Sequence, residues 1–269
     1  MEKIKISAVQ MNAEIGNKTA NLNKAEKLIR DIDNDVDLIV LPEVWTIGWS
    51  PVNFRNNAEK IDKSETINFL SEIAKDFNCW IIGGSIIIKN GEDYYNTCPV
   101  IDRNGKLIGI YSKNHLFSYY GSDENKYVKV GNSPVMVDID GIKTGLTICY
   151  DIRFPEIFRA YRKSGVDLLV NCAAWGLKKP IPWECMTRCR AVENQTYMVA
   201  LTQSGYIENG EWNIGHSRII DYKGETITEI KDQKEGAMTA ILEMKPMYEF
   251  REKCKCIDDI RKSYEVKCI

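Results

Sequence analysis

Three residues whose side chains can together hydrolyse an amide each follow a predicted strand. They are Cys149 after 143–148, Glu43 after 36–41, and Lys113 after 107–112. A thiol, a carboxylate and an ammonium group supply a nucleophile, a proton acceptor and a fixed positive charge, and this set is sufficient for acyl transfer. If the three strand ends converge, the chain carries the parts of a cysteine-dependent acyl-transfer site.

Cys149 lies at a predicted strand-to-helix turn, because a helix is expected to begin near Pro155. Backbone N–H groups at the start of a helix lower the pKa of a thiol and offer donors to a developing oxyanion, and the Tyr150 N–H is the expected donor. Each reactive residue also has an ordinary explanation: Cys149 as a buried structural thiol, Glu43 as a solvated carboxylate and Lys113 as a surface lysine. The combination, and no single residue, predicts the site.

The elements that position these residues alternate between strands and helices. Apolar runs predict strands over 4–10, 36–41, 80–88, 95–101, 107–112, 135–139, 143–148, 167–172, 197–202, 216–220, 226–230 and 238–242. Helices are predicted over 20–32, 64–77, 155–163 and 183–194, the second with Ser64 as its N-cap. The dipeptides Asn104-Gly105 and Asp140-Gly141 predict hairpins, so the sheets are mixed. About a dozen strands are too many for one open sheet, so the pattern favours an α/β fold of two stacked sheets with helices on their outer sides.

Length and composition predict one domain over residues 1–269, in which 246–269 is a charged, cysteine-bearing C-terminal tail. No apolar run reaches the roughly 20 residues that a membrane span needs, and the N-terminus has no secretory-signal pattern, so we expect a cytoplasmic protein. A net charge of −2 with both signs interspersed provides no basic surface. Neither a membrane nor nucleic acid is therefore expected as a partner.

The chain has nine cysteines, an odd number that is widely spaced, which indicates reduced thiols rather than disulfides. The closest pairs are Cys185 with Cys189 in a predicted helix and Cys254 with Cys256 in the tail. With two histidines in the chain and no C-x2-C pair, the spacing does not predict a zinc site. Most of the cysteines are expected to be small buried apolar residues.

Five ordered motifs cover nearly the whole chain. They are Leu-Pro-Glu at 41–43, Lys-Asn-His-Leu-Phe at 113–117, Ile-Cys-Tyr-Asp-Ile-Arg-Phe-Pro-Glu at 148–156, Arg-Cys-Arg-Ala-Val-Glu-Asn at 188–194 and Gly-His-Ser-Arg-Ile-Ile at 215–220. This pattern closely resembles the nitrilase, or carbon–nitrogen hydrolase, superfamily. The resemblance implies an α-β-β-α four-layer sandwich and a catalytic triad of Glu43, Lys113 and Cys149. It also implies a second active-site carboxylate, which falls on Glu124.

With these residues, the expected reaction is hydrolysis of a linear amide through a cysteine thioester. Glu43 accepts the thiol proton, Lys113 favours the thiolate, and Cys149 attacks the amide carbon. The Lys113 ammonium and the Tyr150 N–H stabilise the oxyanion, and Glu43 then activates the water that releases the acid. Glu124 is expected to orient Lys113 or the substrate, with a structural ion pair as its alternative. No cofactor or metal is required.

The finer resemblance is to the ω-amidase branch, which acts on amides of the 2-oxoglutaramate and 2-oxosuccinamate type. Arg153 is a candidate for a substrate carboxylate, although an internal salt bridge explains it equally well. The N-carbamoyl amino acid hydrolase branch has two adjacent arginines here, whereas this chain has Ile152 first. Trp175 and His115 are the other two residues expected to bind the substrate. For Trp175 the alternative explanation is packing in the core. At 202–203 the chain has Thr-Gln where relatives often have Asn, which predicts a changed polar group in the pocket.

Other interpretations remain open at this point. A Cys–His hydrolase would use His115 or His216, although His115 is also explained by orienting the loop that carries Lys113, and His216 by a core or edge role. An aliphatic amidase, a carbamoyl-amine hydrolase and a nitrilase share the same acyl-thioester chemistry. A binding or assembly module with an idle catalytic set is the alternative of a different class. Family resemblance also implies a homodimer or larger homo-oligomer.

Overall fold

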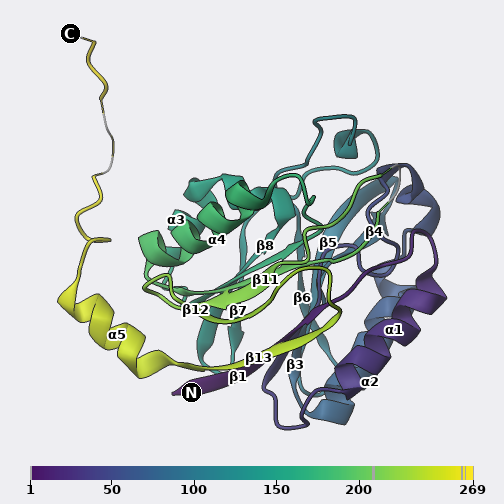
Figure 1. Cartoon of the computed structure of the whole chain (residues 1–269), viewed down its shortest axis with the longest axis horizontal. Coiled ribbons are helices and arrows are strands. Elements are labelled where there is room, and N and C mark those ends of the chain that lie inside the picture. Colours follow the sequence, from purple (N-terminus) through teal and green to yellow (C-terminus); the bar gives the residue numbers. More distant parts are fainter. Residues whose placement is uncertain (1, 208–209, 262, 264, 269) are drawn as a thin grey trace.

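The computed structural model of the protein describes residues 2–207, 210–261, 263 and 265–268. Two β-sheets are stacked face to face, with α1 and α2 on one outer side and α3 and α4 on the other (Figure 1). The five α-helices of this described part are α1 (Lys18–Arg30), α2 (Glu65–Phe77), α3 (Pro155–Lys163), α4 (Pro180–Asn194) and α5 (Met244–Lys253). The predicted four-layer α-β-β-α sandwich is confirmed.

The first sheet has seven strands in the order β13-β1-β2-β3-β5-β4, with β6 paired to β5. Its strands are β1 (Lys3–Gln10), β2 (Leu38–Val40), β3 (Trp80–Ile82), β4 (Ile86–Asn90), β5 (Asp93–Ile101), β6 (Leu107–Ser112) and β13 (Gly236–Glu243). β1, β2 and β3 are parallel, whereas β5 and β6 form the antiparallel hairpin predicted from Asn104-Gly105. The parallel strands end on the same side of the sheet, and Glu43 follows one of them.

The second sheet has six strands in the order β12-β11-β10-β9-β8-β7. They are β7 (Val135–Ile139), β8 (Ile142–Ile148), β9 (Leu168–Ala173), β10 (Tyr197–Thr202), β11 (Ser217–Ile220) and β12 (Thr226–Ile230). β8, β9 and β10 are parallel, and β7 forms a hairpin with β8 at the predicted Asp140-Gly141 turn. Cys149 therefore follows a central strand of this sheet, covered on both faces as its apolar sequence predicts.

The side chains of β1 point alternately to the two faces of the first sheet, and this explains how the layers are held together. Ile4, Ile6 and Ala8 are fully buried in the core between the two sheets, whereas Val9 belongs to the core under α1 and α2. Successive side chains of a strand point to opposite faces, so one apolar strand contacts two layers. The burial of large apolar side chains on both faces is the main force that fixes the sheets relative to each other.

The predicted strand 80–88 is wrong, since the chain forms β3 and β4 with a break at Gly83-Gly84. Gly84 has φ +65°, and a Cβ atom there would lie 2.0 Å from the Pro42 carbonyl oxygen. The Ser85 N–H donates to the same oxygen at 3.1 Å. The break therefore lets the backbone pass against the residue that precedes Glu43, a contact that the apolar run alone cannot reveal.

The C-terminal segment predicted as a tail from residue 246 begins inside α5, which the sequence analysis did not predict. Arg251 donates to Asp167 Oδ1 at 2.6 Å and to the Gln195 carbonyl at 2.8 Å, and Tyr248 donates to Asp167 Oδ2 at 3.0 Å. α5 is therefore fastened to the second sheet and α4. The described residues beyond α5 extend away from the body of the molecule (Figure 1).

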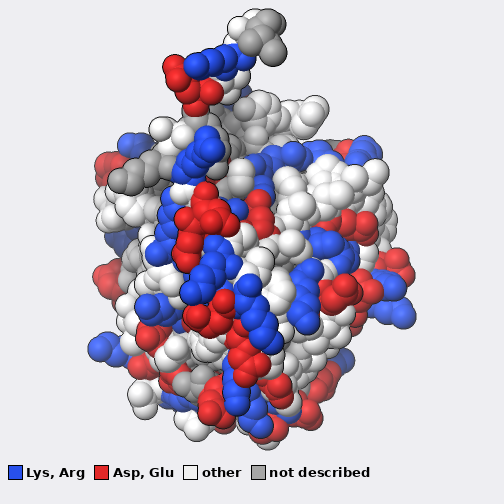
Figure 2. Space-filling view, turned by 90° about the vertical axis from the view of Figure 1, so that its left-hand side faces the viewer, with Lys and Arg blue, Asp and Glu red and all other residues white. Residues whose placement is uncertain are grey.

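The surface carries acidic and basic side chains close to one another. On the face that is turned to the viewer in Figure 2, lysine and arginine alternate with aspartate and glutamate over α5 and the body behind it. This arrangement agrees with the small net charge of −2. Within the described residues, no helix has the length and apolar character to cross a bilayer.

Candidate active site

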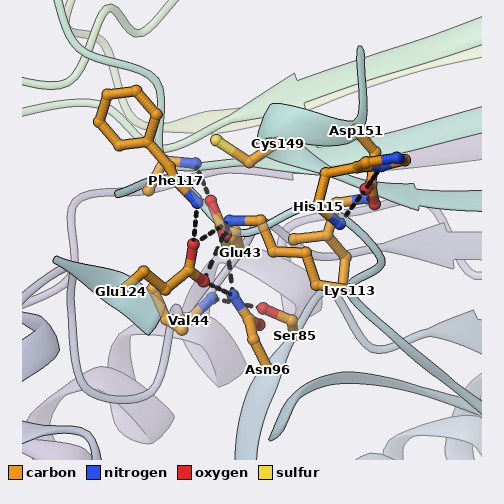
Figure 3. Close-up of polar contacts among 12 residues, drawn as sticks. Glu43, Val44, Ser85, Asn96, Lys113, His115, Phe117, Glu124, Cys149 and Asp151 are labelled. Atoms are coloured by element: carbon orange, nitrogen blue, oxygen red, sulfur yellow. Dashed lines mark hydrogen bonds and ion pairs between the residues drawn. The ribbon is translucent and has the colours of Figure 1, made fainter. Parts of the chain in front are cut away.

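The structure brings the four predicted acid, base and nucleophile residues to one place between the two sheets. Glu43 lies just beyond β2, Lys113 directly follows β6, and Cys149 follows β8 at the start of the 3-10 helix η5 (Cys149–Arg153). Glu124 begins the 3-10 helix η4 (Glu124–Lys126). Figure 3 shows Cys149 beside the linked side chains of Glu43, Lys113 and Glu124. Segments far apart in the sequence therefore form a single cluster.

Lys113 is bound between two carboxylates. Its Nζ donates to Glu43 Oε1 at 2.8 Å and to Glu124 Oε2 at 2.9 Å, and all three side chains are fully buried. The ammonium also lies 4.9 Å from the centre of the Trp49 ring. Burial of a charge is tolerated when it is paired and hydrogen-bonded, and here each group meets that condition.

Neutral donors complete the environment of the two carboxylates. Asn96 Nδ2 donates to Glu43 Oε1 at 2.9 Å and to Glu124 Oε1 at 3.2 Å. The Ala174 N–H donates to Glu43 Oε2 at 2.8 Å, and the Phe117 N–H donates to Glu124 Oε2 at 2.7 Å. Asn96 was not among the predicted site residues. A signal existed, because a buried asparagine inside a strand is unusual and needs hydrogen-bond partners.

Cys149 adopts φ +47°, in the left-handed region that non-glycine residues seldom occupy, and it is only 7% exposed. Burial raises the pKa of the Cys149 thiol, and so does the negative charge of Glu43; Lys113 opposes them. The prediction that a helix start would lower this pKa is wrong for the free site. Desolvation and a neighbouring carboxylate outweigh the cation, so the resting nucleophile is a thiol and needs a base.

The pKa values of Lys113 and Glu124 are both raised. Burial alone would lower the pKa of Lys113, but the charges of Glu124 and Glu43 together raise it well above its usual range. Burial raises the pKa of Glu124, with Lys113 opposing and Glu43 adding to the effect. The two carboxylates thus hold Lys113 in its charged form.

Asp151 holds the turn that carries Cys149. Its Oδ2 accepts from the Ile148 N–H at 2.9 Å and from the Tyr111 hydroxyl at 2.6 Å, and its Oδ1 accepts from the His115 N–H at 2.9 Å. The His115 ring is also 2.8 Å from Asp151 Oδ1, and it stacks on Phe154 with centroids 3.7 Å apart. Asp151 therefore joins the segment after β6 to the segment after β8.

A cavity of about 890 Å³ opens beside Cys149. It is lined by Trp49, Phe117, Tyr119, Tyr120, Cys149, Tyr150, Arg153, Trp175, Lys178, Lys179 and Glu211, among others. Of the residues predicted to bind substrate, Arg153 and Trp175 line this cavity, whereas His115 is not among its lining residues. Apolar walls with a few charged groups are typical of small-molecule sites.

Arg153 has no ion pair within the described part of the chain, so the internal salt bridge that was its alternative explanation does not form among these residues. Its guanidinium carbon lies 5.4 Å from the Trp175 ring centre and 5.9 Å from that of Tyr150. Trp175 is buried, and its Nε1–H donates to the Lys179 carbonyl at 2.8 Å. Trp175 thus combines the two roles considered for it, since it packs in the core and also lines the cavity.

The Thr-Gln pair at 202–203 supports the backbone and does not line the cavity. Gln203 Nε2 donates to the Glu43 carbonyl at 2.6 Å, and Thr202 Oγ1 accepts from the Trp175 N–H at 3.0 Å. His216 lies at 3.0 Å from Glu229 Oε2 and contacts Arg218. Among the residues described, no hydrogen bond joins either histidine to Cys149, which leaves the Cys–His alternative without support.

The remaining thiols and acids form no metal site that the structure displays. Cys79, Cys98 and Cys172 are buried, whereas Cys185, Cys189, Cys254, Cys256 and Cys268 are exposed. In the part of the chain that the structure describes, no group of three or more histidine, cysteine, aspartate or glutamate residues could hold a metal ion.

The buried cluster of Glu43, Lys113 and Glu124 beside Cys149, set between two sheets, has the parts of a cysteine-dependent hydrolase. Residues 5–252 match the family model described as carbon-nitrogen hydrolase, so the chain belongs to this family of hydrolytic enzymes. The resemblance inferred from the motifs is therefore confirmed.

Amidases are among the proteins that the chain most resembles. A 2-oxoglutaramate amidase of Bacillus subtilis is 34% identical over 96% of this chain and 97% of its own length. The omega-amidase NIT2 of Mus musculus is 31% identical over 94% of this chain and 93% of its length. Among solved structures, the Nit3 protein of Saccharomyces cerevisiae, described as a member of branch 10 of the nitrilase superfamily, has TM-score 0.85 and 29% identity over 94% of each chain.

Proposed function

We propose that the protein is an ω-amidase, which hydrolyses the terminal amide of a short 2-oxo acid of the 2-oxoglutaramate or 2-oxosuccinamate type. The observation that carries this proposal is a cation, Arg153, that lines the cavity beside Cys149 without an acidic partner in the described chain. An arginine free of internal ion pairs can bind the carboxylate of such a substrate. The names of the amidase relatives support the same substrate class.

Acylation begins with transfer of the Cys149 thiol proton to Glu43, whose charge acts on the thiol. The sulfur attacks the amide carbon, and the electron pair of the C=O bond moves to oxygen. Lys113 and the Tyr150 N–H stabilise this oxyanion, and one such donor typically contributes about 3–4 kcal/mol. Glu43 returns the proton to nitrogen as the C–N bond breaks, so ammonia leaves and a thioester remains.

Deacylation uses the same carboxylate as a base. Glu43 accepts a proton from water, whose oxygen attacks the thioester carbon, and the proton then passes to the departing Cys149 sulfur. The products are the carboxylic acid and the free thiol. Glu124 is a positioning residue in this proposal, because its two contacts with Lys113 hold the ammonium against Glu43. His115 has the same kind of role through Asp151.

The test offers 2-oxoglutaramate, 2-oxosuccinamate, pentanamide, an N-carbamoyl amino acid and a nitrile, and measures ammonia release. We expect the highest kcat/KM with the two oxo-acid amides. Cys149→Ala and Glu43→Gln are each expected to abolish turnover, because acylation needs both the nucleophile and its base. Mass spectrometry of the wild-type protein quenched during turnover would identify the acid half from the mass added to Cys149. A preference for the carbamoyl compound, nitrile or uncharged amide would replace the proposed substrate class. Absence of turnover with every compound would favour a non-enzymatic role.

We also propose a single domain over 1–269, a cytoplasmic location and a homodimer. Packing of α5 against Asp167 supports the single domain. Exposed Ile181 (71%) and Val192 (44%) lie on one face of α4 with Cys185 and Cys189, and this unpartnered face supports association of two copies.

A further inference from the structure

Two cations, Arg153 and Lys179, line the cavity beside Cys149. The Lys179 ammonium lies 4.5 Å from the ring centre of Phe117 and 4.8 Å from that of Tyr120, and Arg153 lies over Trp175 and Tyr150. Within the described residues, neither cation forms an ion pair or donates a side-chain hydrogen bond. The adjacent Lys178 differs, because its Nζ is bound to Glu211 at 2.5 Å.

Burial lowers the pKa of Lys179, and a charge on Cys149 opposes that effect; Arg153 lowers the pKa further, and Glu211 raises it. The like charge of Arg153 therefore disfavours the charged form of Lys179 while the cavity holds no anion. Two cations that repel each other across one cavity are stabilised when an anion binds between them.

Trp175 contacts both residues. The Trp175 Nε1–H donates to the Lys179 carbonyl at 2.8 Å, and the ring of the same tryptophan lies under Arg153. Lys179 is also the N-cap residue of α4 and makes no capping bond with its side chain. The main chain of Lys179 is therefore anchored to Trp175, and the contacts of its ammonium among the described residues are with the two rings, which leaves its N–H donors available to a ligand.

We propose that Lys179 binds the carboxylate of the substrate together with Arg153 and thereby sets the preference for amides of short acids over uncharged amides. This inference rests on the proposed function and assigns its specificity to a residue that the motifs do not include. Lys179 makes its contact at the end of the substrate remote from the amide. Its loss therefore weakens binding of the acid without changing the chemistry at Cys149.

The experiment compares 2-oxoglutaramate with pentanamide, an uncharged amide of the same chain length, in the full-length protein. We expect Lys179→Met to lower kcat/KM for 2-oxoglutaramate by about 10- to 100-fold, mainly through KM, because a hydrogen bond to a charged group contributes about 1.5–3 kcal/mol. For pentanamide, kcat/KM should stay within about twofold, since that substrate has no carboxylate to lose. Lys179→Arg should restore most of the preference.

Lys163→Met is the matched control, because it removes an exposed lysine in the last turn of α3 that does not line the cavity. It should leave the ratio of the two kcat/KM values unchanged. An equal loss on both substrates in Lys179→Met would assign Lys179 to the shape of the cavity and overturn the inference. An unchanged ratio in that variant would also overturn it, while leaving the proposed function intact if the wild type prefers 2-oxoglutaramate. A wild type that prefers pentanamide would refute both proposals.

Discussion

At the scale of single residues, the site is a cluster of charged side chains that are buried away from water. Glu43 and Glu124 share one ammonium, so the ionised cluster has one more negative than positive charge. A neutral Cys149 thiol avoids adding a second excess charge, which agrees with its raised pKa. Proton transfer to Glu43 removes a negative charge as the thiolate forms. The buried cluster therefore keeps its net charge while the nucleophile is created.

Asn96→Leu tests how far neutral donors position the two carboxylates. The amide donates to both Glu43 and Glu124, and leucine keeps much of the volume without the donor. We expect kcat to fall about 10- to 100-fold with a small change in KM, since a buried hydrogen bond to a charged group contributes about 1.5–3 kcal/mol. The acidic limb of the pH–rate profile should move to higher pH, because an ionised carboxylate loses a donor.

Steady-state kinetics from pH 5 to 9 would measure this change. Asn57→Leu is the control, because that amide bonds a backbone carbonyl and does not line the cavity. If Asn96→Leu changed KM alone, or matched the control, Asn96 would have no positioning role.

The sequence predicted the convergence of Glu43, Lys113 and Cys149, because each follows a strand whose apolar pattern is strong. It did not predict the roles of Asn96 and Asp151. The bonds of Asn96 to the two carboxylates cross 28 and 53 residues, and those of Asp151 to His115 and Tyr111 cross 36 and 40 residues. The direction of the pKa shift of the Cys149 thiol was predicted wrongly because it, too, depends on contacts between residues that are distant in the sequence. The helix start is a local feature, whereas burial and the Glu43 charge come from the tertiary structure.

At the scale of elements, β8, η5 and α3 form the unit that presents the nucleophile. Tyr161 of α3 packs over Gly145 of β8, and its hydroxyl donates to the Leu146 carbonyl at 2.6 Å and accepts from the Val135 N–H at 2.9 Å. The tyrosine therefore fixes how far α3 lies from the strand. Since η5 connects the two elements, this spacing also determines where Cys149 lies.

Gly145→Ala should disturb that spacing. A Cβ at Gly145 would lie 2.9 Å from Tyr161 Cγ, whereas a Cβ at Gly109 of β6 would meet nothing within 4 Å. We expect Gly145→Ala to lower the free energy of unfolding by about 1–3 kcal/mol, the usual cost of overpacking. Its kcat should fall as well. Urea unfolding and turnover of the two variants measure the effect, and equal values for Gly145→Ala and Gly109→Ala would show that α3 adjusts without cost.

Local signals predicted most elements but not those set by distant contacts. Ser64 caps α2 as expected, with its Oγ accepting from the Ile67 N–H at 2.9 Å. The division of β3 from β4 depends on contact with Pro42, and α5 depends on Asp167. The sequence of α5 has Met244, Met247 and Tyr248 at helical spacing, but the run is short, half charged and contains Pro246, so the pattern alone did not predict a helix there.

At the scale of the whole molecule, the site lies where the two sheets meet. Glu43 and Lys113 come from the first sheet, while Cys149 and the Ala174 N–H come from the second. Gln203, which follows β10, donates to the Glu43 carbonyl and so links the sheets next to the site. Catalytic geometry is therefore a property of the complete sandwich, and conditions that loosen the sandwich should abolish activity together with the fold.

Buried thiols predict a loss of stability at alkaline pH. Burial raises the pKa of Cys79 to about 12 and that of Cys98 further, against about 8.5 in an unfolded chain. Above about pH 8.5 the unfolded chain binds fewer protons than the native protein, so stability is complete below that pH and falls as the pH rises toward the native values. Each thiol contributes a slope of up to about 1.4 kcal/mol per pH unit.

Cys98→Ala should make this decline shallower, by about 1 kcal/mol per pH unit between about pH 9 and 11, even though the smaller side chain lowers stability at every pH. Cys185→Ala is the control, because that cysteine is exposed and its removal should leave the slope unchanged. Urea unfolding at several pH values measures both slopes. A loss of packing that is the same at every pH cannot change the slope of the free energy of unfolding against pH. Parallel plots for the wild type and Cys98→Ala would therefore contradict the prediction, because they would mean that the Cys98 thiol ionises as readily in the folded core as in the unfolded chain.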